Sequence, residues 1–576
     1  MNIADQLVEI LVESGARRVY GVVGDSLNPI VDAIRRAPGI EWAHVHNEEA
    51  GAFAASAEAQ LTGTLAVCAG SSGPGNTHLI QGLYDANRTG APVLAIASHI
   101  PTSHIGTAYF QETRPETVFM DASVWCHTLS SADQMPLMPR VAIQEATAKR
   151  GVSVLVVPGN IAGLDATHRT DHHTVCSELG RVLPPESQVQ QLADAINAAE
   201  TVMLFCGAGV RGAHAEVIAL AKAVNAPVGH SLRGKEWIQY DNPYDVGMTG
   251  LLGYGACHLA LHDADLVVLL GTDFPYDTFL PGQNTAQVDA NAAHLGRRTA
   301  LEVAVHGDVG ETLRALAGLV KPKTSRTFLD DMLQRHERAL ANVVGAYTGD
   351  MHQRTPLHPE YVADVLDELA ADDAVFTVDT GMNNVWAARY ITPNGRRRVI
   401  GSFVHGTMAN ALPHAIGAAF ANPGRQIVAM CGDGGLAMLL GELLTVRSHD
   451  LPITIVVFNN SALGMVELEM LVDGFPSYGT RSGHVNYADI AMAMGLDAVR
   501  ITDPADLRDG LERALADSKP VLVDVVTDPL ALSIPPEVTA HELRGFATAA
   551  AHTVLAGGVG RMLELARANL RNIRAV

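Results

Sequence analysis

The chain has 576 residues and a formal net charge of −22, from 40 Lys and Arg against 62 Asp and Glu. This length exceeds what one hydrophobic core serves, so three or four domains are expected. The negative charge argues against a general nucleic-acid surface. A hydrophobic content of 48% with 53 glycines argues against disorder and favours α/β layers.

The first 20 residues carry Asp5, Glu9 and Glu13 among apolar residues, which predicts an amphipathic helix rather than a signal peptide. No run of about 18 uncharged apolar residues occurs, so we expect no membrane-spanning helix. The six cysteines show no C-x-x-C spacing, and most lie in apolar runs. This usage indicates reduced core thiols in a cytoplasmic protein.

Short apolar runs alternate with helical patterns in the first block, residues 1–165. The runs RVYGVVG, LAVCAG, PVLAIAS and SVLVVPG indicate buried strands, with amphipathic stretches between them. This alternation predicts a parallel sheet covered by helices on both faces. Residues 161–188 are polar and contain proline, which predicts a linker.

Two further blocks show the same alternation. In residues 183–325 the expected strands are TVMLFCGAGV, APVGHSL, ADLVVLLGTDF, AQVDA and AVHGD. A charged helix and connector over 322–355 lead to residues 350–530, with strands AVFTVDTG, QIVAMCGDGG, PITIVVFNN and PVLVDVVTD. We therefore predict three doubly wound parallel-sheet domains, followed by a tail over 531–576 that contains an amphipathic helix.

The second block contains GAGVRG between a strand and a helix. Gly207, Gly209 and Gly212 match G-x-G-x-x-G, the pattern of a dinucleotide-binding turn. However, the next strand, APVGHS, is not followed by the acid that would bind the ribose of NAD. The pattern therefore argues against NAD.

The third block places an acid between glycines in CGDGG. Asp433 ends the strand QIVAM, and Asn460 ends the next strand 27 residues later, since 460 − 433 = 27. A right-handed crossover makes these strands parallel, so both residues emerge where open α/β sheets bind ligands. Carboxylate, amide and main-chain carbonyl oxygens suit Mg²⁺, and Gly434 and Gly435 let N–H groups approach a diphosphate. A tight turn with an Asp N-cap is the alternative, but GDGG followed by NN at this spacing favours a thiamine diphosphate site.

These motifs resemble the thiamine diphosphate-dependent pyruvate oxidase and acetolactate synthase family, and most closely its bacterial quinone-dependent pyruvate dehydrogenases. The resemblance spans the chain and is dense in GVVGDSLN, EEAGAFAASAEAQ, GSSGPGN, YFQET, LRGKEW, YDNPYDVGMTGL, GTMANALP and VAMCGDGG. It implies a pyrimidine-binding thiamine domain (1–165), an FAD-binding domain (183–325), a diphosphate- and Mg²⁺-binding thiamine domain (350–530) and a membrane-associating tail (531–576).

The resemblance also assigns roles to residues. Glu48 matches the acid that activates the aminopyrimidine ring, Phe110 and Gln111 match residues facing the substrate, and Met408 matches the side chain that holds the cofactor bent. Met465 matches a position between thiamine and flavin. The implied metal ligands are Asp433, Asn460 and Ala462. The implied cofactor-binding positions are Gly406, Thr407, Met408, Asp433, Gly434, Gly435, Asn460, Ser461, Ala462, Leu463, Gly464, Met465 and Val466 for thiamine diphosphate, and Gly207, Ala208, Gly209, Thr249, Gly250, Leu251, Leu252, Thr272, Asp273, Phe274, Pro275, Tyr276, Asp289 and Asp308 for FAD.

The implied reaction is oxidative decarboxylation of pyruvate to acetate and CO₂, with electrons passing through FAD to a membrane quinone. In the family, Glu48 meets the Asp433 site across a subunit boundary, which implies a dimer at least and a homotetramer as the usual state. Quinone-dependent relatives have an aromatic residue where this chain has Met465, whereas acetolactate synthases resemble it there. A carboligase of that type is therefore the alternative, and a phosphate-dependent pyruvate oxidase is a third.

The tail ends in RMLELARANLRNIRAV, residues 561–576. As a helix it places apolar side chains on one side and arginines on the other, with a local charge of +3 from four Arg and one Glu. Together with the resemblance, this predicts binding to an anionic lipid surface, and hence a cytoplasmic protein peripherally associated with the inner face of the membrane. A helix docked on its own subunit is the alternative.

Overall fold

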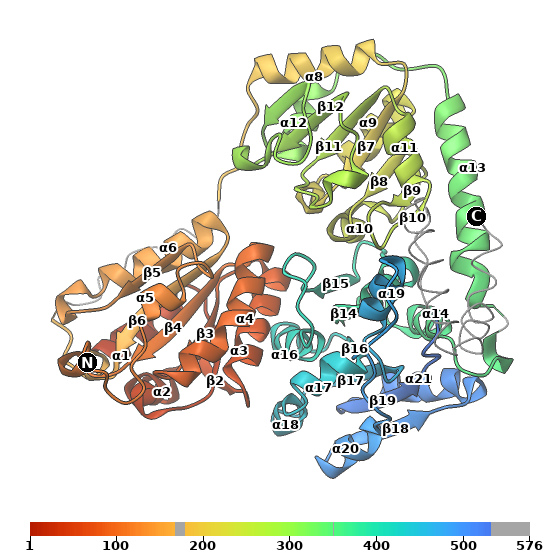
Figure 1. Cartoon of the computed structure of the whole chain (residues 1–576). Helices are drawn as coiled ribbons and strands as arrows, with labels where there is room; N and C mark the ends of the chain where they lie inside the picture. The colour runs from red at the N-terminus through yellow and green to blue at the C-terminus, as the bar shows by residue number, and fades with distance from the viewer. Residues whose placement is uncertain (168–178, 350, 532–576) are drawn as a thin grey trace.

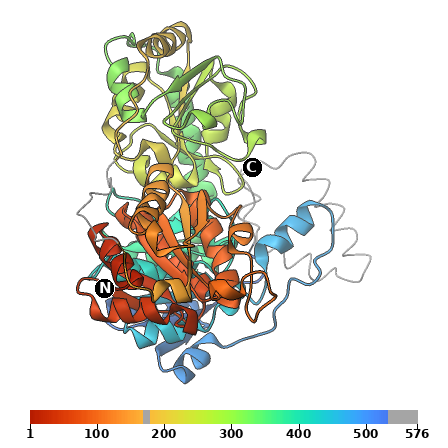
Figure 2. The ribbon, with the colours of Figure 1, turned by 90° about the vertical axis from the view of Figure 1, so that its left-hand side faces the viewer.

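The computed structural model describes residues 1–167, 179–349 and 351–531, which form three α/β domains around three separate sheets (Figure 1). In Figure 1 the first domain lies at the lower left, the third at the lower right and the middle domain above them. After a 90° turn the first domain lies in front of the third, still below the middle domain (Figure 2). The prediction of three parallel-sheet domains is confirmed, and the predicted tail helix lies outside the described residues.

The first sheet has the order β2-β1-β3-β4-β6-β5, with all neighbouring strands parallel. Its central strands are buried along their whole length because helices cover both faces. The strands are β1 (Arg18–Gly21), β2 (Glu41–His44), β3 (Ala66–Gly70), β4 (Val93–His99), β5 (Trp125–Thr128) and β6 (Val152–Pro158). The helices are α1 (Ile3–Glu13), α2 (Asn28–Arg36), α3 (Glu48–Thr62), α4 (Pro74–Thr89), α5 (Pro115–Val118), α6 (Leu137–Lys149) and α7 (Gly159–Ala162).

The third sheet, β15-β14-β16-β17-β19-β18, repeats the order of the first when strands are counted within each domain. Its neighbours are also all parallel. The strands are β14 (Val375–Val378), β15 (Arg398–Gly401), β16 (Ile427–Gly432), β17 (Ile453–Asn459), β18 (Asp497–Ile501) and β19 (Val521–Val526). The helices are α14 (Pro359–Leu369), α15 (Met382–Tyr390), α16 (Ala411–Ala421), α17 (Asp433–Met438), α18 (Glu442–Ser448), α19 (Gly464–Val472), α20 (Tyr487–Ala493) and α21 (Leu507–Ala516).

The middle sheet has the order β10-β9-β8-β7-β11-β12-β13, parallel except for the short edge strand β10. Without β10 this is the 3-2-1-4-5-6 order of dinucleotide-binding folds, whose ligand site lies where the order reverses, between β7 and β11. The strands are β7 (Val202–Cys206), β8 (Val228–His230), β9 (Asp245–Met248), β10 (Tyr254–Gly255), β11 (Leu266–Leu270), β12 (Thr285–Asp289) and β13 (Val303–His306). The helices are α8 (Glu186–Ala198), α9 (His214–Val224), α10 (Leu232–Ile238), α11 (Cys257–Asp263), α12 (Val309–Leu316) and the connecting α13 (Thr327–Asn342).

The first and third domains share one core through α3 and α16. Alanines of both helices belong to the same buried cluster, and a Cβ on Gly417 of α16 would lie 2.1 Å from the carbonyl oxygen of Ala54 in α3. Small residues therefore let the two backbones approach closely. This packing fixes the position of α3, which begins at Glu48.

Helix α10 joins the middle domain to both neighbours. Arg233 donates a 2.9 Å hydrogen bond to the carbonyl of Thr89, at the end of α4 in the first domain. The buried Lys235 donates 2.6 Å bonds to the carbonyls of Ala388 and Ile391, at the end of α15 in the third domain. Among the described residues, no helix has both the length and the apolar composition to cross a bilayer.

Candidate active site

Asp433 lies directly after β16, at the carboxyl edge of the third sheet. Its side chain is buried, and Ser482 Oγ lies 3.4 Å from its Oδ2. The hydroxyl of Tyr487 donates a 2.9 Å bond to its main-chain carbonyl. Burial raises the pKa of Asp433 to about 6, against hydrogen bonds that lower it, chiefly from the backbone of Gly434. A bound cation would offset this cost of burying the ionised carboxylate.

Asn460 lies beside Asp433 because β16 and β17 are parallel neighbours, with Gly432 paired to Phe458. Its Oδ1 accepts a 2.9 Å bond from the Ala462 N–H, and the intervening Ser461 has a positive φ of 55°. The backbone is therefore strained between two predicted metal ligands, as at many functional sites. This set of hard oxygen donors fits Mg²⁺. The described residues contain no cluster of three or more His, Cys, Asp or Glu that could hold a metal, so a cation here would depend on one carboxylate, neutral oxygens and ligand oxygens.

The glycines after Asp433 are required by packing. A Cβ on Gly434 would lie 2.7 Å from Leu463 Cδ2 and 3.4 Å from Met408 Cε. A Cβ on Gly435 would lie 1.7 Å from Asp379 Oδ2. These contacts bring the GDGG turn against the residues predicted to flank thiamine diphosphate.

Asp379 lies below this turn, at the end of β14, and sequence reasoning did not single it out. Its Oδ1 accepts 3.1 Å and 3.2 Å bonds from the backbone N and Nδ2 of Asn410, next to the GTM segment. Burial raises its pKa to about 7, although N–H groups that include that of Gly432 lower it. One carboxylate therefore holds together three loops of the predicted site.

From the sequence, the stretch LAMLLGELLTVRSHD after the GDGG turn is predicted to be one helix that connects two parallel strands, and this prediction is wrong in one respect. It forms two short helices, α17 and α18, separated at residues 439–441. The break begins at Leu439, whose backbone leaves helical geometry at φ −123° and ψ 36°, and it ends at Gly441. The chain turns there, and α18 reaches the first domain.

A cavity of about 1990 Å³ has residues of all three domains in its wall and extends from the Asp433 site to the carboxyl edge of the middle sheet. Most of the predicted cofactor positions line it. These are Ala208, Gly209, Thr249, Gly250, Leu251, Leu252, Thr272, Asp273, Phe274, Pro275, Tyr276, Asp289, Asp308, Gly406, Met408, Asp433, Gly434, Gly435, Asn460, Ala462, Leu463, Gly464, Met465 and Val466. Gly207, Thr407 and Ser461 are not among the lining residues, and Thr407 instead accepts a 2.7 Å bond from Gln81 of α4.

Three glycines meet where the middle sheet reverses its order. Cβ atoms on Gly207 and Gly209 would lie 2.4 Å and 3.0 Å from the carbonyl oxygen of Gly271, which follows β11. The first two glycines of the G-x-G-x-x-G pattern therefore let the turns after β7 and β11 pack together. Gly212 has a positive φ of 77° and open space where a Cβ would be, so its requirement is conformational.

The two predicted strand-end acids of the middle domain both form turns. Asp289 Oδ1 accepts a 2.8 Å bond from the N–H of Asn291 and lies 3.3 Å from His294 Nδ1. Asp308 is the N-cap of α12, and its Oδ1 accepts a 3.1 Å bond from the N–H of Glu311. Both also line the cavity, so their role in forming turns is compatible with the FAD contacts that the resemblance implies.

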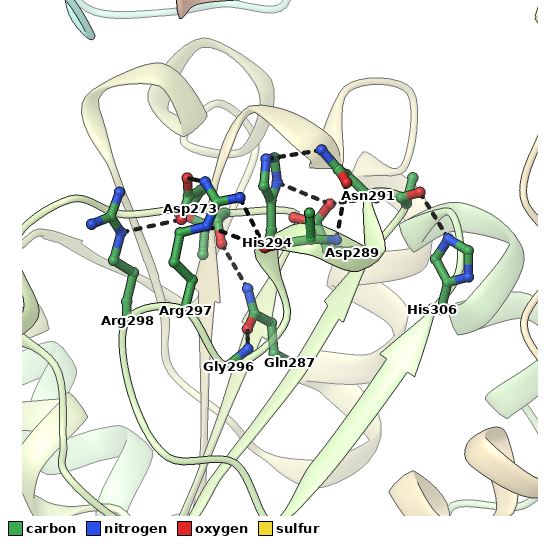
Figure 3. A network of polar contacts seen from close by, with 12 residues as sticks. Asp273, Gln287, Asp289, Asn291, His294, Gly296, Arg297, Arg298 and His306 are labelled. Atoms are coloured by element: carbon green, nitrogen blue, oxygen red, sulfur yellow. Dashed lines mark hydrogen bonds and ion pairs between the residues drawn. The ribbon is translucent and has the colours of Figure 1, made fainter. Parts of the chain in front are cut away.

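A pair of arginines near these acids was missed by sequence reasoning. Figure 3 shows Arg297 and Arg298 converging on Asp273, with Nη1 and Nε at 2.9 Å and 3.2 Å from its two oxygens. Gln287 of β12 accepts a 3.0 Å bond from the N–H of Gly296 and donates another to a carbonyl after β11. All three charged side chains line the cavity. The two guanidinium groups give this wall hydrogen-bond donors that suit a phosphate-bearing ligand, beside the carboxylates of Asp273 and Asp289.

Glu48 is the first residue of α3, behind the N-cap Asn47. It is buried, its Oε2 lies 2.9 Å from His78 Nδ1, and its Oε1 lies 2.8 Å from where a Cβ on Gly75 would be. Glu49 is only half-buried, and burial raises its pKa. Of the two adjacent acids, Glu48 therefore faces the GSSGPGN turn.

The predicted substrate residues lie at the same edge of the first sheet. Ser72 Oγ donates a 3.1 Å bond to Gln111 Oε1, and Gln111 has a positive φ of 62°. The Phe110 side chain is 77% exposed, which is unusual for an aromatic residue. Neither these two residues nor Glu48 is among those that line the cavity. Within one chain, the predicted catalytic acid and the predicted metal site thus lie in separate places.

Comparison with known proteins places these features in one family. The models of the thiamine pyrophosphate (thiamine diphosphate) enzyme N-terminal, central and C-terminal domains match residues 1–118, 189–316 and 379–525. The chain is 34% identical over 544 residues to a putative thiamine pyrophosphate-containing protein, YdaP, of Bacillus subtilis, covering 94% of each. It is 30% identical over 535 residues to a pyruvate oxidase of Lactiplantibacillus plantarum, covering 90% of this chain and 87% of that one. It is 28% identical over 540 residues to the acetolactate synthase isozyme 1 large subunit of Escherichia coli, covering 91% and 94%.

Proposed function

The chain belongs to the thiamine pyrophosphate enzyme family, and on this basis we propose that it oxidatively decarboxylates pyruvate with a quinone as electron acceptor. The balanced reaction converts pyruvate, water and quinone into acetate, CO₂ and quinol. Thiamine diphosphate supplies an electron sink for decarboxylation, and FAD supplies a two-electron acceptor. The observation that carries the proposal is one cavity lined by most of the predicted thiamine diphosphate and FAD positions and by the three predicted metal ligands.

The proposed metal site is Mg²⁺ held by Asp433, Asn460 and the Ala462 carbonyl. The rest of its octahedron would come from diphosphate oxygens and water. The donor set and the buried Asp433 carboxylate support this assignment. The N–H groups of Gly434 and Gly435 are proposed to contact the diphosphate, since both residues line the cavity.

The proposed catalytic acid is Glu48 of a second copy of this chain. Within one chain Glu48 does not line the cavity, so the site is proposed to be completed across a dimer interface within a homotetramer. Large exposed side chains support such an interface: Phe110 is 77% exposed, and Phe475 and Tyr478, after α19, are 62% and 87% exposed. In the dimer, Phe110 and Gln111 are proposed to face pyruvate.

An acetolactate synthase-like carboligase is the second candidate. Met465 lines the cavity and packs against the core of the third domain, where quinone-dependent relatives are expected to carry an aromatic residue. The similarity to acetolactate synthase subunits also favours this candidate. Association with the inner face of the membrane is proposed from the sequence of residues 561–576 alone.

An anaerobic titration with pyruvate distinguishes these functions. We expect flavin absorbance to bleach with one equivalent of pyruvate per flavin, and acetate and CO₂ to accumulate when a quinone is supplied. Acetolactate formation with oxidised flavin would instead establish the carboligase.

Glu48→Gln tests the catalytic acid. We expect the rate to fall at least about 100-fold while thiamine diphosphate still binds, because general acid catalysis contributes on that order. Glu49→Gln is the matched control, since it removes the same charge from the adjacent, less buried position. Equal rates for the two variants would refute the assignment.

A further inference from the structure

Helix α18 of the third domain lies against the segment that leads into α3 of the first domain. Residues 45–47 join β2 to α3, whose first residue is Glu48. Helix α18 follows α17, which begins at Asp433 (Figure 1). A side chain on α18 can therefore act on the loop that carries the proposed catalytic acid.

Glu442, the first residue of α18, makes this contact. Its Oε2 accepts a 2.7 Å bond from Thr445 Oγ1 and a longer, 3.4 Å bond from the backbone N–H of His46. The Nδ1 of His46 lies 2.8 Å from Thr445 Oγ1, and since the threonine hydroxyl donates to Glu442, this nitrogen carries the hydrogen. One residue beyond α18, His449 Nε2 bonds the carbonyl of His44 at 2.9 Å. The end of β2 and the start of the loop are thus held from both ends of α18.

Glu442 is 1% exposed, so keeping its carboxyl ionised in this position costs free energy of desolvation. Burial raises the pKa of Glu442 to about 7, and the nearby charge of Glu48 also raises it. Hydrogen bonds from the Thr445 hydroxyl and from the N–H groups of His46 and Asn47 lower this pKa. Other titratable groups on the elements around it are His44, Glu49, His78, His414 and His449. A buried acid that titrates near neutral pH and bonds the backbone beside Glu48 has no part in the mechanism proposed above.

We propose that Glu442 is a positioning residue for Glu48, holding through its carboxylate the backbone from which the catalytic acid projects. The inference rests on the proposed function of Glu48. The ionised carboxylate accepts hydrogen bonds from the Thr445 hydroxyl and from the loop N–H groups. Protonation turns one acceptor oxygen into a donor and loosens the loop. Turnover therefore rises with pH through the titration of Glu442.

The test compares Glu442→Gln with Glu302→Gln in the full-length holoenzyme. Glu302 is exposed and lies between β12 and β13, so its substitution removes the same charge away from the site. We measure kcat and KM for pyruvate from about pH 5.5 to 8.5, with thiamine diphosphate and Mg²⁺ saturating. For Glu442→Gln we expect kcat at pH 8 to fall roughly fivefold to tenfold, with KM within twofold. We also expect the inflection near pH 7, present in the unaltered enzyme and in Glu302→Gln, to disappear.

An inflection near pH 7 that persists in Glu442→Gln, or a variant indistinguishable from Glu302→Gln, would overturn the inference. Thr445→Val provides a second variant if Glu442→Gln does not fold. It keeps the carboxylate but removes the hydroxyl between Glu442 and His46, so kcat should fall while the inflection remains. Glu48→Gln separates the two proposals: if it keeps full activity the proposed function fails, whereas if it is inactive and Glu442→Gln shows normal pH dependence, only the role of Glu442 fails.

Discussion

Gly435→Ala tests most directly whether the GDGG turn holds the diphosphate end of the cofactor. The added Cβ would lie 1.7 Å from Asp379 Oδ2, more than 1 Å inside any normal contact, and it would also lie 2.6 Å from Asp379 Cγ. Asp379 is 1% exposed and bonds both the backbone and the side chain of Asn410. The carboxylate cannot move away without breaking these bonds, so the substitution displaces either the GDGG turn or the loop after Met408.

The expected magnitude follows from two costs. Overpacking a buried site costs about 1–3 kcal/mol, and losing a hydrogen bond to a charged group costs about 1.5–3 kcal/mol. If even about 2 kcal/mol of this sum appears in ligand binding, the Kd for thiamine diphosphate rises roughly 30-fold.

The assay is calorimetric titration of the apoprotein with thiamine diphosphate in excess Mg²⁺. Gly441→Ala is the matched control, because a Cβ there meets nothing within 4 Å and the backbone is helical at φ −58° and ψ −22°. It should bind normally and be slightly more stable. If Gly435→Ala binds within threefold of Gly441→Ala, the turn does not bind the diphosphate as proposed.

Two further predictions concern the middle domain. Burial raises the pKa of the Asp245 carboxyl to about 6. Burial also lowers the pKa of the His230 imidazole to about 3 and that of His336 to about 4. Both imidazoles beside Asp245 are therefore neutral. Because the carboxyl pKa of Asp245 is raised in the folded chain, its contribution to stability is complete below the ordinary pKa of 3.8 and is lost as pH rises through about 6. The thermal midpoint of Asp245→Asn should therefore rise relative to that of the unaltered chain as pH increases across this window. A constant difference between the two midpoints from pH 4 to pH 8 would contradict this. Arg298→Ala removes one of the two guanidinium groups beside Asp273. In a fluorescence titration, flavin binding should weaken roughly tenfold, the equivalent of about 1.4 kcal/mol. An unchanged affinity would exclude a role for this wall of the cavity in flavin binding.

The central strands could be predicted from the sequence because helices cover both of their faces, so they appear as continuous apolar runs. Three of the strands that were not predicted, β5, β15 and β18, lie at sheet edges. Strand β18, DAVRI, has only one fully buried residue, and β5, WCHT, has none. An edge strand has a single neighbour and is partly solvated, so its sequence carries little apolar signal.

The residues of the candidate site likewise include some that could be predicted from the sequence and some that could not. Asp433 and Asn460 could be placed together because chain order and crossover handedness determine which strand ends meet. Asp379, Arg298 and Glu442 could not, because they reach the site region through tertiary contacts between segments far apart in the chain. The equal strand orders of the first and third sheets likewise leave no repeat in the sequence, since many side-chain sets can fill the same layers.

The contacts of α10 restrict how ligands exchange. Arg233 and Lys235 attach this short helix to backbone carbonyls of two other domains, and Lys235 is almost fully buried. Swinging the middle domain outward as a rigid body would break these hydrogen bonds, each at a cost of about 1.5–3 kcal/mol because the donor is charged. A long ligand is therefore expected to leave the cavity by movement of the loops that line it, and its residence time should depend on how fast those loops open.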